Sequence, residues 1–262
     1  KYRKNLLPKY SFRHYYNLFK AGTIMATETV THVADLRPIS PFLKYWYKNS
    51  GFNYVFLQHG VMYMISLDSE SRNFFKFIER PGYVNRIVVS SKLEAEHFVY
   101  RGDFAPEELY ICGLLKFDYA KREDVHDRIV IMPTWRPWEA VLASENFRET
   151  TYYKFVEKIY NAVPDEHKDK VIVLPHPLIK KYAIAAYENM ADTDDNEIVR
   201  LMLPENTHEE VLRKTDTLIT DYSSCAYDAF YRGANVIFDW EEKDFTVSQY
   251  GATARLMLTE IS

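Results

Sequence analysis

Short apolar runs alternate along the chain with longer amphipathic stretches. Most runs are four or five residues long, which predicts strands, and the stretches between them are long enough to predict helices. Strands alternating with helices are typical of βα units, so the pattern predicts an α/β fold with parallel sheets. The predicted strands cover residues 23–29, 54–57, 86–89, 109–112, 129–132, 171–174, 198–202, 217–220 and 235–238.

Helix start and stop signals agree with this alternation. Ser91-x-x-Glu94 and Thr207-x-x-Glu210 have the spacing of capping boxes, in which two side chains bond reciprocally to the first backbone N–H groups of a helix. Gly233 follows a predicted helix and serves as its stop. The predicted helices cover residues 42–48, 91–100, 152–161, 180–189, 209–214 and 224–232.

The segment 121–128 separates two halves that repeat the alternation. Nearly all of its residues are charged or polar, so we interpret it as a linker. The length of 262 residues fits one large domain or two of about 100–150 residues. We expect a first domain over 1–124 and a second over 125–262, each doubly wound, with a cleft between them.

Composition narrows the class of protein. A charged fraction of 27% and a hydrophobic fraction of 47% exclude general disorder, and a net charge of −4 gives no indication of a nucleic-acid partner. Cys112 and Cys225 fit a reducing, cytoplasmic compartment. No apolar run approaches the ~20 residues of a membrane helix. Because there is no initiator Met, we expect residue 1 to be a boundary inside a longer protein.

Residues 1–22 form a basic, aromatic N-terminal arm. The arm holds six Lys or Arg residues and no acidic residue, interleaved with aromatic side chains. This composition fits adhesion to an anionic membrane surface, here the inner face of the cell membrane, or to an anionic polymer. The alternative is a solvated helix whose aromatic face packs on the domain.

Candidate chemistry follows the predicted strands, because ligands of open parallel sheets bind outside the carboxyl ends. His59 follows one strand, and its neighbour Gly60 lets a substrate come close. A histidine near neutral pKa can take a proton from a hydroxyl. The alternative is a histidine that only hydrogen-bonds its own turn.

Three strands of the second half are followed by hydrogen-bond donors. Thr134 and Arg136 could hold phosphate oxygens, although Arg136 could instead be a surface arginine stacked on a tryptophan. His176 lies between two prolines, either as a rigidly placed donor or as part of a turn. The segment 221–224, with Asp221, Ser223 and Ser224, opens a helix and could bind an anion or simply cap the helix.

Together these residues suit a diphosphate held by the second half while a base reaches in from the first. No Walker loop or G-x-G-x-x-G motif is present. The sequence also lacks H-E-x-x-H, paired C-x-x-C and G-x-S-x-G motifs, so it indicates neither a metal site nor a hydrolase. No cofactor is indicated, and a divalent metal ion stays open.

Five motifs in order resemble the CDP-glycerol glycerophosphotransferase family of teichoic-acid primases and polymerases, with relatives in capsule synthesis. They span most of the chain, from about residue 54 to 240. The motifs are Gln58-His59-Gly60, Gly113-Leu-Leu-Lys-Phe-Asp118, Pro133-Thr-Trp-Arg136, Pro175-His-Pro177 and Thr220-Asp-Tyr-Ser-Ser224. The resemblance implies a GT-B-like fold of two Rossmann-type domains. It also implies transfer of glycerol phosphate, or another polyol phosphate, from a CDP-activated donor to a hydroxyl of a growing polymer, with release of CMP.

The resemblance also implies roles for individual residues. His59 would be the general base on the acceptor and His176 a second active-site histidine at the donor phosphates. The implied substrate-binding residues are Gly60, Lys116, Thr134, Arg136, Asp221, Ser223 and Ser224. The first half departs from the family pattern, since Val61-Met62-Tyr63 replaces the usual Thr-Pro after His-Gly and Lys116 replaces an arginine.

The resemblance implies as partners a CDP-polyol donor and a polymeric or lipid-linked acceptor. Two other functions stay open. One is a GT-B glycosyltransferase that uses a nucleotide-sugar. The other is a non-catalytic module that binds an anionic polymer or membrane through the N-terminal arm.

Overall fold

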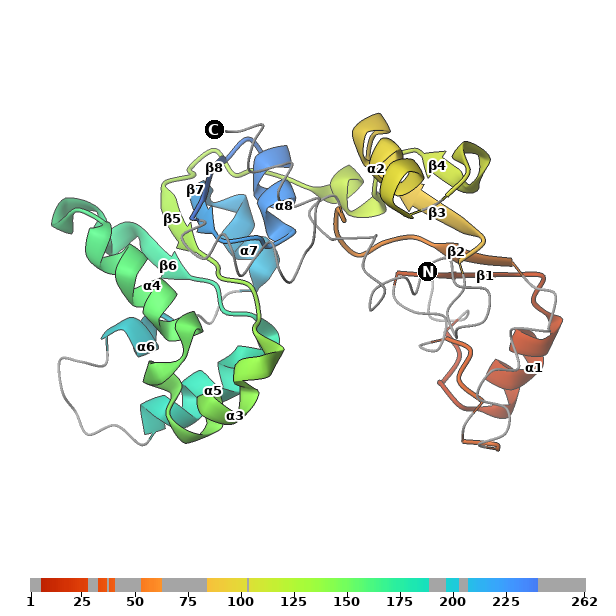
Figure 1. Ribbon diagram of the computed structural model, residues 1–262, viewed down its shortest axis with the longest axis horizontal. Coiled ribbons are helices and arrows are strands. Elements are labelled where there is room, and N and C mark those ends of the chain that lie inside the picture. Colours follow the sequence, from red (N-terminus) through yellow and green to blue (C-terminus); the bar gives the residue numbers. More distant parts are fainter. Residues whose placement is uncertain are drawn as a thin grey trace. The chain divides into compact units, whose positions relative to one another are not determined.

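The computed structural model describes residues 6–27, 33–36, 38–40, 53–62, 84–102, 104–188, 197–202 and 207–239. The chain forms two compact units, the first running to Leu115 and the second beginning at Lys116. Each unit is built on a four-stranded sheet in which every described pairing is parallel (Figure 1). The predicted α/β fold with parallel sheets is therefore confirmed.

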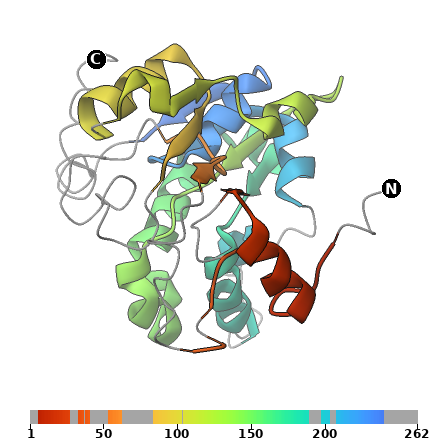
Figure 2. The same ribbon diagram turned by 90° about the vertical axis from the view of Figure 1, so that its right-hand side faces the viewer.

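The first unit has its strands side by side in chain order. They are β1 (Thr23–Ala26), β2 (Asn53–Phe56), β3 (Arg86–Val89) and β4 (Leu109–Ile111). Helix α2 (Lys92–Gly102) lies above this sheet and helix α1 (Phe12–Lys20) below it in both views (Figures 1 and 2). The 3-10 helix η5 (Pro106–Glu108) leads into β4.

The second unit has the strand order β6-β5-β7-β8. Its strands are β5 (Arg128–Ile131), β6 (Val171–Val173), β7 (Thr215–Thr220) and β8 (Asn235–Phe238). Its α-helices are α3 (Ala140–Glu145), α4 (Thr151–Ala162), α5 (Pro177–Glu188), α6 (Glu197–Leu201), α7 (His208–Arg213) and α8 (Cys225–Tyr231). Its 3-10 helices are η7 (Pro137–Glu139), η8 (Phe147–Glu149) and η9 (Asp165–Lys170), while η6 (Leu115–Tyr119) crosses the boundary between the units.

Helices cover both faces of the second sheet. Neighbouring residues of β5 point to opposite faces, and Val130 and Ile131 are both fully buried. Ile131 belongs to a core with side chains of α4, α5 and α6, whereas Val130 packs with side chains of α7 and α8. A strand that is buried on both faces requires a continuous apolar run, which explains why the sequence pattern locates β5.

Local signals predict several helix ends. The Thr207–Glu210 capping box forms with both reciprocal bonds at the start of α7. Gly233 follows α8 with φ of 81°, a left-handed conformation that favours glycine. At the start of α2 the Ser91 hydroxyl accepts the Glu94 N–H at 3.2 Å, but the Glu94 carboxylate bonds elsewhere.

One predicted strand is wrong. Residues 198–202 were expected to be extended, but α6 occupies most of this run. Val199 and Met202, three positions apart, are both fully buried against the core that α4 and α5 share. A short apolar run fits a buried helix as well as a strand, and packing selected the helix here. The predicted helix 42–48 lies outside the described residues.

Residues 116–124 belong to the second unit and bond to other parts of it. Arg122 donates to the Gly233 carbonyl oxygen at 2.7 Å, and the Glu123 N–H donates to the Arg213 carbonyl oxygen at 2.9 Å. Part of the charged segment that we expected to be a linker is thus held against the second unit. The predicted domain division at 124/125 stays a prediction.

Helix α1 has one buried and one exposed face. Leu18 is buried, and the His14 ring Nε2 donates to the Val33 carbonyl oxygen at 2.9 Å. Phe12, Tyr16 and Phe19 are instead 84%, 51% and 58% exposed. The alternative that the aromatic face of the arm packs on the domain therefore holds for Tyr15, which is half-buried against the core, and is wrong for these three side chains.

Candidate active site

The second sheet has a topological switch point between β5 and β7. The chain leaves β5 for β6 on one side and returns to β7 on the other. Ligands of open α/β sheets bind at such a point, outside the carboxyl ends of the strands. The segments that leave β5 and β7 here are 133–136 and 221–224, two of the stretches predicted to bind the donor.

The Asp221 carboxylate joins these two segments. It accepts the Thr134 N–H at 2.9 Å and the Thr134 hydroxyl at 2.7 Å, and also the Tyr222 N–H at 2.7 Å. Nη2 of Arg136 lies 3.3 Å from its second oxygen. The carboxylate therefore links residues 87 positions apart into one rigid edge of the site.

This ion pair is almost fully buried. The side chains of Arg136 and Asp221 are 2% and 5% exposed. The alternative reading of Arg136 as a surface arginine is therefore wrong. A buried ion pair needs additional hydrogen bonds to offset the loss of hydration, and Thr134 and Tyr222 supply them to Asp221.

His176 caps helix α5, which begins at Pro177. Its ring Nδ1 accepts the Leu178 N–H at 3.2 Å, as an N-cap side chain does. A neutral ring that accepts at Nδ1 carries its proton on Nε2 and can donate it. Burial, and to a smaller extent the charge of His208, lower the pKa of His176. The neutral, Nε2-protonated ring is therefore favoured near neutral pH.

Two aromatic residues hold His176 in place. The ring of Trp135 stacks on the His176 ring with centroids 6.2 Å apart and planes 15° apart. The backbone N–H of His176 donates to the Tyr152 hydroxyl oxygen at 3.1 Å. Nothing in the sequence indicates this role of Tyr152, because an interior tyrosine of an amphipathic helix gives no local sign of such a contact.

The remaining predicted donor residues lie around the start of α8. Ser223 is buried and its hydroxyl oxygen accepts the Cys225 N–H at 3.3 Å, whereas Ser224 is half-buried. Lys116 donates to the Asp228 carboxylate at 2.7 Å. Burial and the Asp228 charge raise the pKa of the Cys225 thiol, which keeps it protonated.

His59 stands at the carboxyl end of the first sheet. Its exposed ring contacts the Thr27 carbonyl oxygen through Nδ1 at 2.9 Å, and Thr27 directly follows β1. A carbonyl oxygen only accepts, so Nδ1 is the donor. The basic lone pair of the neutral ring is therefore on Nε2.

A buried carboxylate, which we identified only as half of a capping box, holds the loop that carries His59. Glu94 is 1% exposed and accepts the Met62 N–H at 2.7 Å and the Ser90 N–H at 2.6 Å. On the other side of His59, Gln58 has φ of 59° and donates from Nε2 to the Val88 carbonyl oxygen at 2.6 Å. The loop with Gly60, which is buried, is thus tied to the end of β3 before His59 and to the first turn of α2 after it.

Each unit therefore has its own group of candidate residues. In the second unit the structure brings Thr134, Arg136 and Asp221 into direct contact and links His176 to them through Trp135 and Tyr152. The first unit contributes His59 and Gly60.

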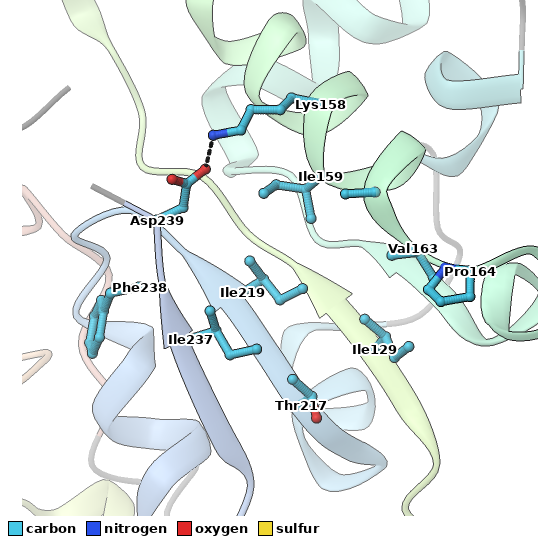
Figure 3. A pocket seen from close by; sticks show the side chains of 11 residues that line it. Ile129, Lys158, Ile159, Val163, Pro164, Thr217, Ile219, Ile237, Phe238 and Asp239 are labelled. Atoms are coloured by element: carbon cyan, nitrogen blue, oxygen red, sulfur yellow. Dashed lines mark hydrogen bonds and ion pairs between the residues drawn. The ribbon is translucent and has the colours of Figure 1, made fainter. Parts of the chain in front are cut away.

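A separate cavity of about 450 Å³ lies on the face of the second sheet beside α4. Ile219 and Ile237 point into it from β7 and β8, and Lys158 reaches Asp239 at its edge (Figure 3). None of the predicted site residues lines it, and most lining side chains are apolar. This surface is unsuited to binding a diphosphate.

The described part of the chain contains no group of three or more His, Cys, Asp and Glu side chains that could hold a metal ion. Within the same residues, no helix has the length and apolar character needed to cross a membrane.

Known proteins are similar to this chain in sequence or in fold. Residues 1–244 match the family described as CDP-Glycerol:Poly(glycerophosphate) glycerophosphotransferase. The minor teichoic acid biosynthesis protein GgaB of Bacillus subtilis (strain 168) is 24% identical over 264 residues, covering 94% of this chain and 27% of GgaB. Two structures of the wall teichoic acid polymerase TagF superpose with TM-scores of 0.56 and 0.55, at 18% and 16% identity.

The similarity to TagF shows a shared fold and covers 95% of this chain and 61% of TagF. The chain thus spans less than two thirds of either relative. The family match runs through both units and includes all five motifs. From this match over most of its length, the chain belongs to the CDP-glycerol:poly(glycerophosphate) glycerophosphotransferase family.

Proposed function

We propose that this chain transfers glycerol phosphate, or another polyol phosphate, from a CDP-activated donor to a hydroxyl of a growing teichoic-acid or capsule polymer. CMP is the second product. Family membership and the teichoic-acid relatives GgaB and TagF support this reaction class. We further propose a GT-B-like arrangement, in which the second unit binds the donor and the first unit supplies the base.

The chemistry is an in-line displacement at phosphorus. The acceptor oxygen attacks the β-phosphorus of the donor while His59 Nε2 takes the hydroxyl proton. A new phosphate ester bond forms, the bridging P–O bond breaks, and the bridging oxygen leaves with CMP. Charge develops on the phosphoryl oxygens, and donors placed in advance stabilise it.

The second unit has the groups needed to bind this charge. His176 donates from Nε2 to the donor phosphates, and the hydroxyls of Ser223 and Ser224 face them at the start of α8. Thr134 contacts the donor, and the guanidinium of Arg136 supplies positive charge from its buried position beside Asp221. Asp221 holds the shape of the loop. Gly60 and Lys116 complete the substrate-binding set.

The observation that carries the proposal is that Nδ1 contacts a carbonyl oxygen in His59 and a backbone N–H group in His176. His59 donates from Nδ1 to a carbonyl oxygen, so the basic lone pair of its neutral ring lies on Nε2. His176 accepts at Nδ1, which leaves Nε2 as a donor. Phosphoryl transfer requires a base that takes the proton of the acceptor hydroxyl. It also requires hydrogen-bond donors that stabilise the charge on the phosphates.

A donor screen tests the proposal. The purified chain is incubated with CDP-glycerol, CDP-ribitol or UDP-sugars and a polyol-phosphate oligomer as acceptor, with and without EDTA. We expect release of CMP and lengthening of the acceptor. Release of UDP from a UDP-sugar would instead indicate a GT-B glycosyltransferase. A chain that binds the polymer and turns over no donor would be a non-catalytic module.

We also propose that the acceptor is lipid-linked and that α1 holds the protein at the inner face of the membrane. The exposed aromatic side chains of α1 share this helix with Arg13 and Lys20, and Lys9 precedes it. Aromatic side chains enter the interfacial region of a bilayer, while basic side chains bind anionic headgroups.

A further inference from the structure

We propose that Tyr152 is a positioning residue for His176. The inference rests on the proposed function, in which His176 binds the donor phosphates. It assigns a role to a buried hydroxyl that is 24 positions away along the chain from the residue it contacts.

The first step concerns the backbone of the Pro175-His176-Pro177 segment. Proline has no N–H group, so the N–H of His176 is the only backbone donor in these three residues. This donor bonds to the Tyr152 hydroxyl oxygen at 3.1 Å. Within this tripeptide, then, the only backbone N–H is committed to Tyr152.

The second step concerns Tyr152 itself. The residue is fully buried, in a core with Val173 and Ile179, which flank the His176 segment on either side. Burial strongly raises the pKa of its hydroxyl, so the group stays neutral. A hydroxyl held in a close-packed core defines the position of its partner more tightly than a mobile surface group would.

The third step concerns what positions Tyr152. The Glu139 carboxylate accepts the Thr151 N–H at 2.9 Å and the Tyr152 N–H at 3.3 Å, at the first turn of α4. Glu139 is 7% exposed, and its own N–H donates to the Arg136 carbonyl oxygen at 3.0 Å. A carboxylate at a helix N-terminus is stabilised by the helix dipole.

Two sets of contacts, one to the ring and one to the backbone, hold His176 in place. Trp135 holds the ring by stacking, and Glu139, four residues later, holds the backbone through Tyr152. The segment that leaves β5 therefore places both the Thr134–Asp221 contact and His176. Tyr152 connects Glu139 to His176. Its hydroxyl also senses the buried ion pair, since the charge of Asp221 raises its pKa and that of Arg136 lowers it.

The test compares Tyr152→Phe with Tyr160→Phe. Both tyrosines are buried on α4, and the Tyr160 hydroxyl donates to Glu197 at 2.5 Å. Each substitution removes one hydroxyl and one hydrogen bond and keeps the ring. We expect Tyr152→Phe to lower kcat for CMP release by on the order of 10–100-fold, because small misplacements of reacting groups are costly. Tyr160→Phe should stay within about twofold of wild type.

A double-mutant cycle separates positioning from a general structural effect. If Tyr152 acts through His176, adding Tyr152→Phe to His176→Ala lowers the residual rate by less than about twofold. An equal loss in both backgrounds would overturn the proposal, as would an unchanged kcat in Tyr152→Phe alone. Glu139→Gln is a second variant that acts through the same route and leaves the core ring in place.

Hydrogen exchange of the His176 amide gives a readout that does not require activity. We expect exchange to be about tenfold faster or more in Tyr152→Phe and unchanged in Tyr160→Phe. An unchanged rate in Tyr152→Phe would overturn the positioning role whatever the enzyme does. Faster exchange in a chain that releases no CMP would support positioning and reject only the proposed function.

Discussion

At the scale of single residues, the Asp221 carboxylate has the largest effect on the geometry of the second unit. It accepts three hydrogen bonds from Thr134 and Tyr222 and pairs with Arg136 in the protein interior. Charges in a low-dielectric environment interact strongly, but each depends on its partner to offset lost hydration. The same pair therefore shapes the proposed donor site and contributes to the folding of the unit.

Replacement of Arg136 by alanine should destabilise the protein. Asp221 would lose its buried cationic partner, and breaking a buried pair typically costs about 3–5 kcal/mol. Urea denaturation measures the change in unfolding free energy. The control is Lys154→Ala, which breaks an ion pair with Glu149 whose two side chains are 54% and 59% exposed, and it should change stability little. Similar losses in both variants would show that burial of the pair has no special effect.

The protonation of His176 should make stability depend on pH. Burial lowers its folded-state pKa below the ordinary value of 6.5, so below that value the unfolded chain binds more protons than the folded one. Stability is then retained above the unfolded pKa and lost as pH falls through the folded pKa. Replacement by glutamine should reduce the loss of unfolding free energy between about pH 8 and about pH 5. An identical pH dependence in His176→Gln and wild type would contradict this prediction.

At the scale of elements, hydrogen bonds to the first backbone N–H groups determine where helix α4 begins. Thr150 caps α4 by accepting the Tyr153 N–H at 3.0 Å. Glu139 accepts the N–H groups of the two preceding residues, Thr151 and Tyr152. Capping therefore fixes where α4 begins. Helix α1 differs from α4, because much of its aromatic surface has no covering layer in the described part of the chain.

Phe12→Ala combined with Phe19→Ala should weaken binding to vesicles that contain anionic phospholipid. Both side chains are more than half exposed, and each would lose part of the transfer free energy that burial of a phenylalanine provides. Sedimentation with vesicles should show affinity falling by about tenfold or more. The matched control is Tyr100→Ala on α2, where an 81% exposed tyrosine in the same unit is removed. Equal effects of the two variants would contradict a specific role of α1.

At the scale of the whole molecule, the candidate residues divide between two sheets. The proposed base lies in the first unit, and the proposed phosphate-binding residues lie in the second. Parallel sheets bring side chains from distant segments together at their carboxyl ends. This arrangement suits a reaction that needs a base and several hydrogen-bond donors. This division predicts that binding and transfer can be separated by mutation.

His59→Ala should abolish transfer and leave donor affinity within about twofold of wild type. General bases contribute about 10²–10⁴-fold to rate, and the donor is held by the other unit. Isothermal titration with CDP-glycerol and the CMP-release assay measure the two effects. His167→Ala, at an exposed histidine of η9, is the control and should change neither quantity. A parallel loss of donor binding in His59→Ala would remove His59 from the role of base.

Local sequence patterns were sufficient to locate most of the helices and strands. Apolar runs located the strands β1 to β8, and the Thr207–Glu210 pair located the start of α7. These signals depend on residues two to four positions apart, so they can be read along the chain. The same local rule could not separate helix from strand at residues 198–202, where burial of Val199 and Met202 decided.

The sequence by itself determined the alternation of strands and helices, the polar side chains at the strand ends and the family of the protein. The tertiary structure alone decided which of these side chains meet. Asp221 with Thr134, Glu94 with Met62, and Tyr152 with His176 are 87, 32 and 24 positions apart. A buried polar group must find a partner, and the folded chain brings that partner from any distance along the sequence. Such pairs therefore have no periodic signature in the sequence.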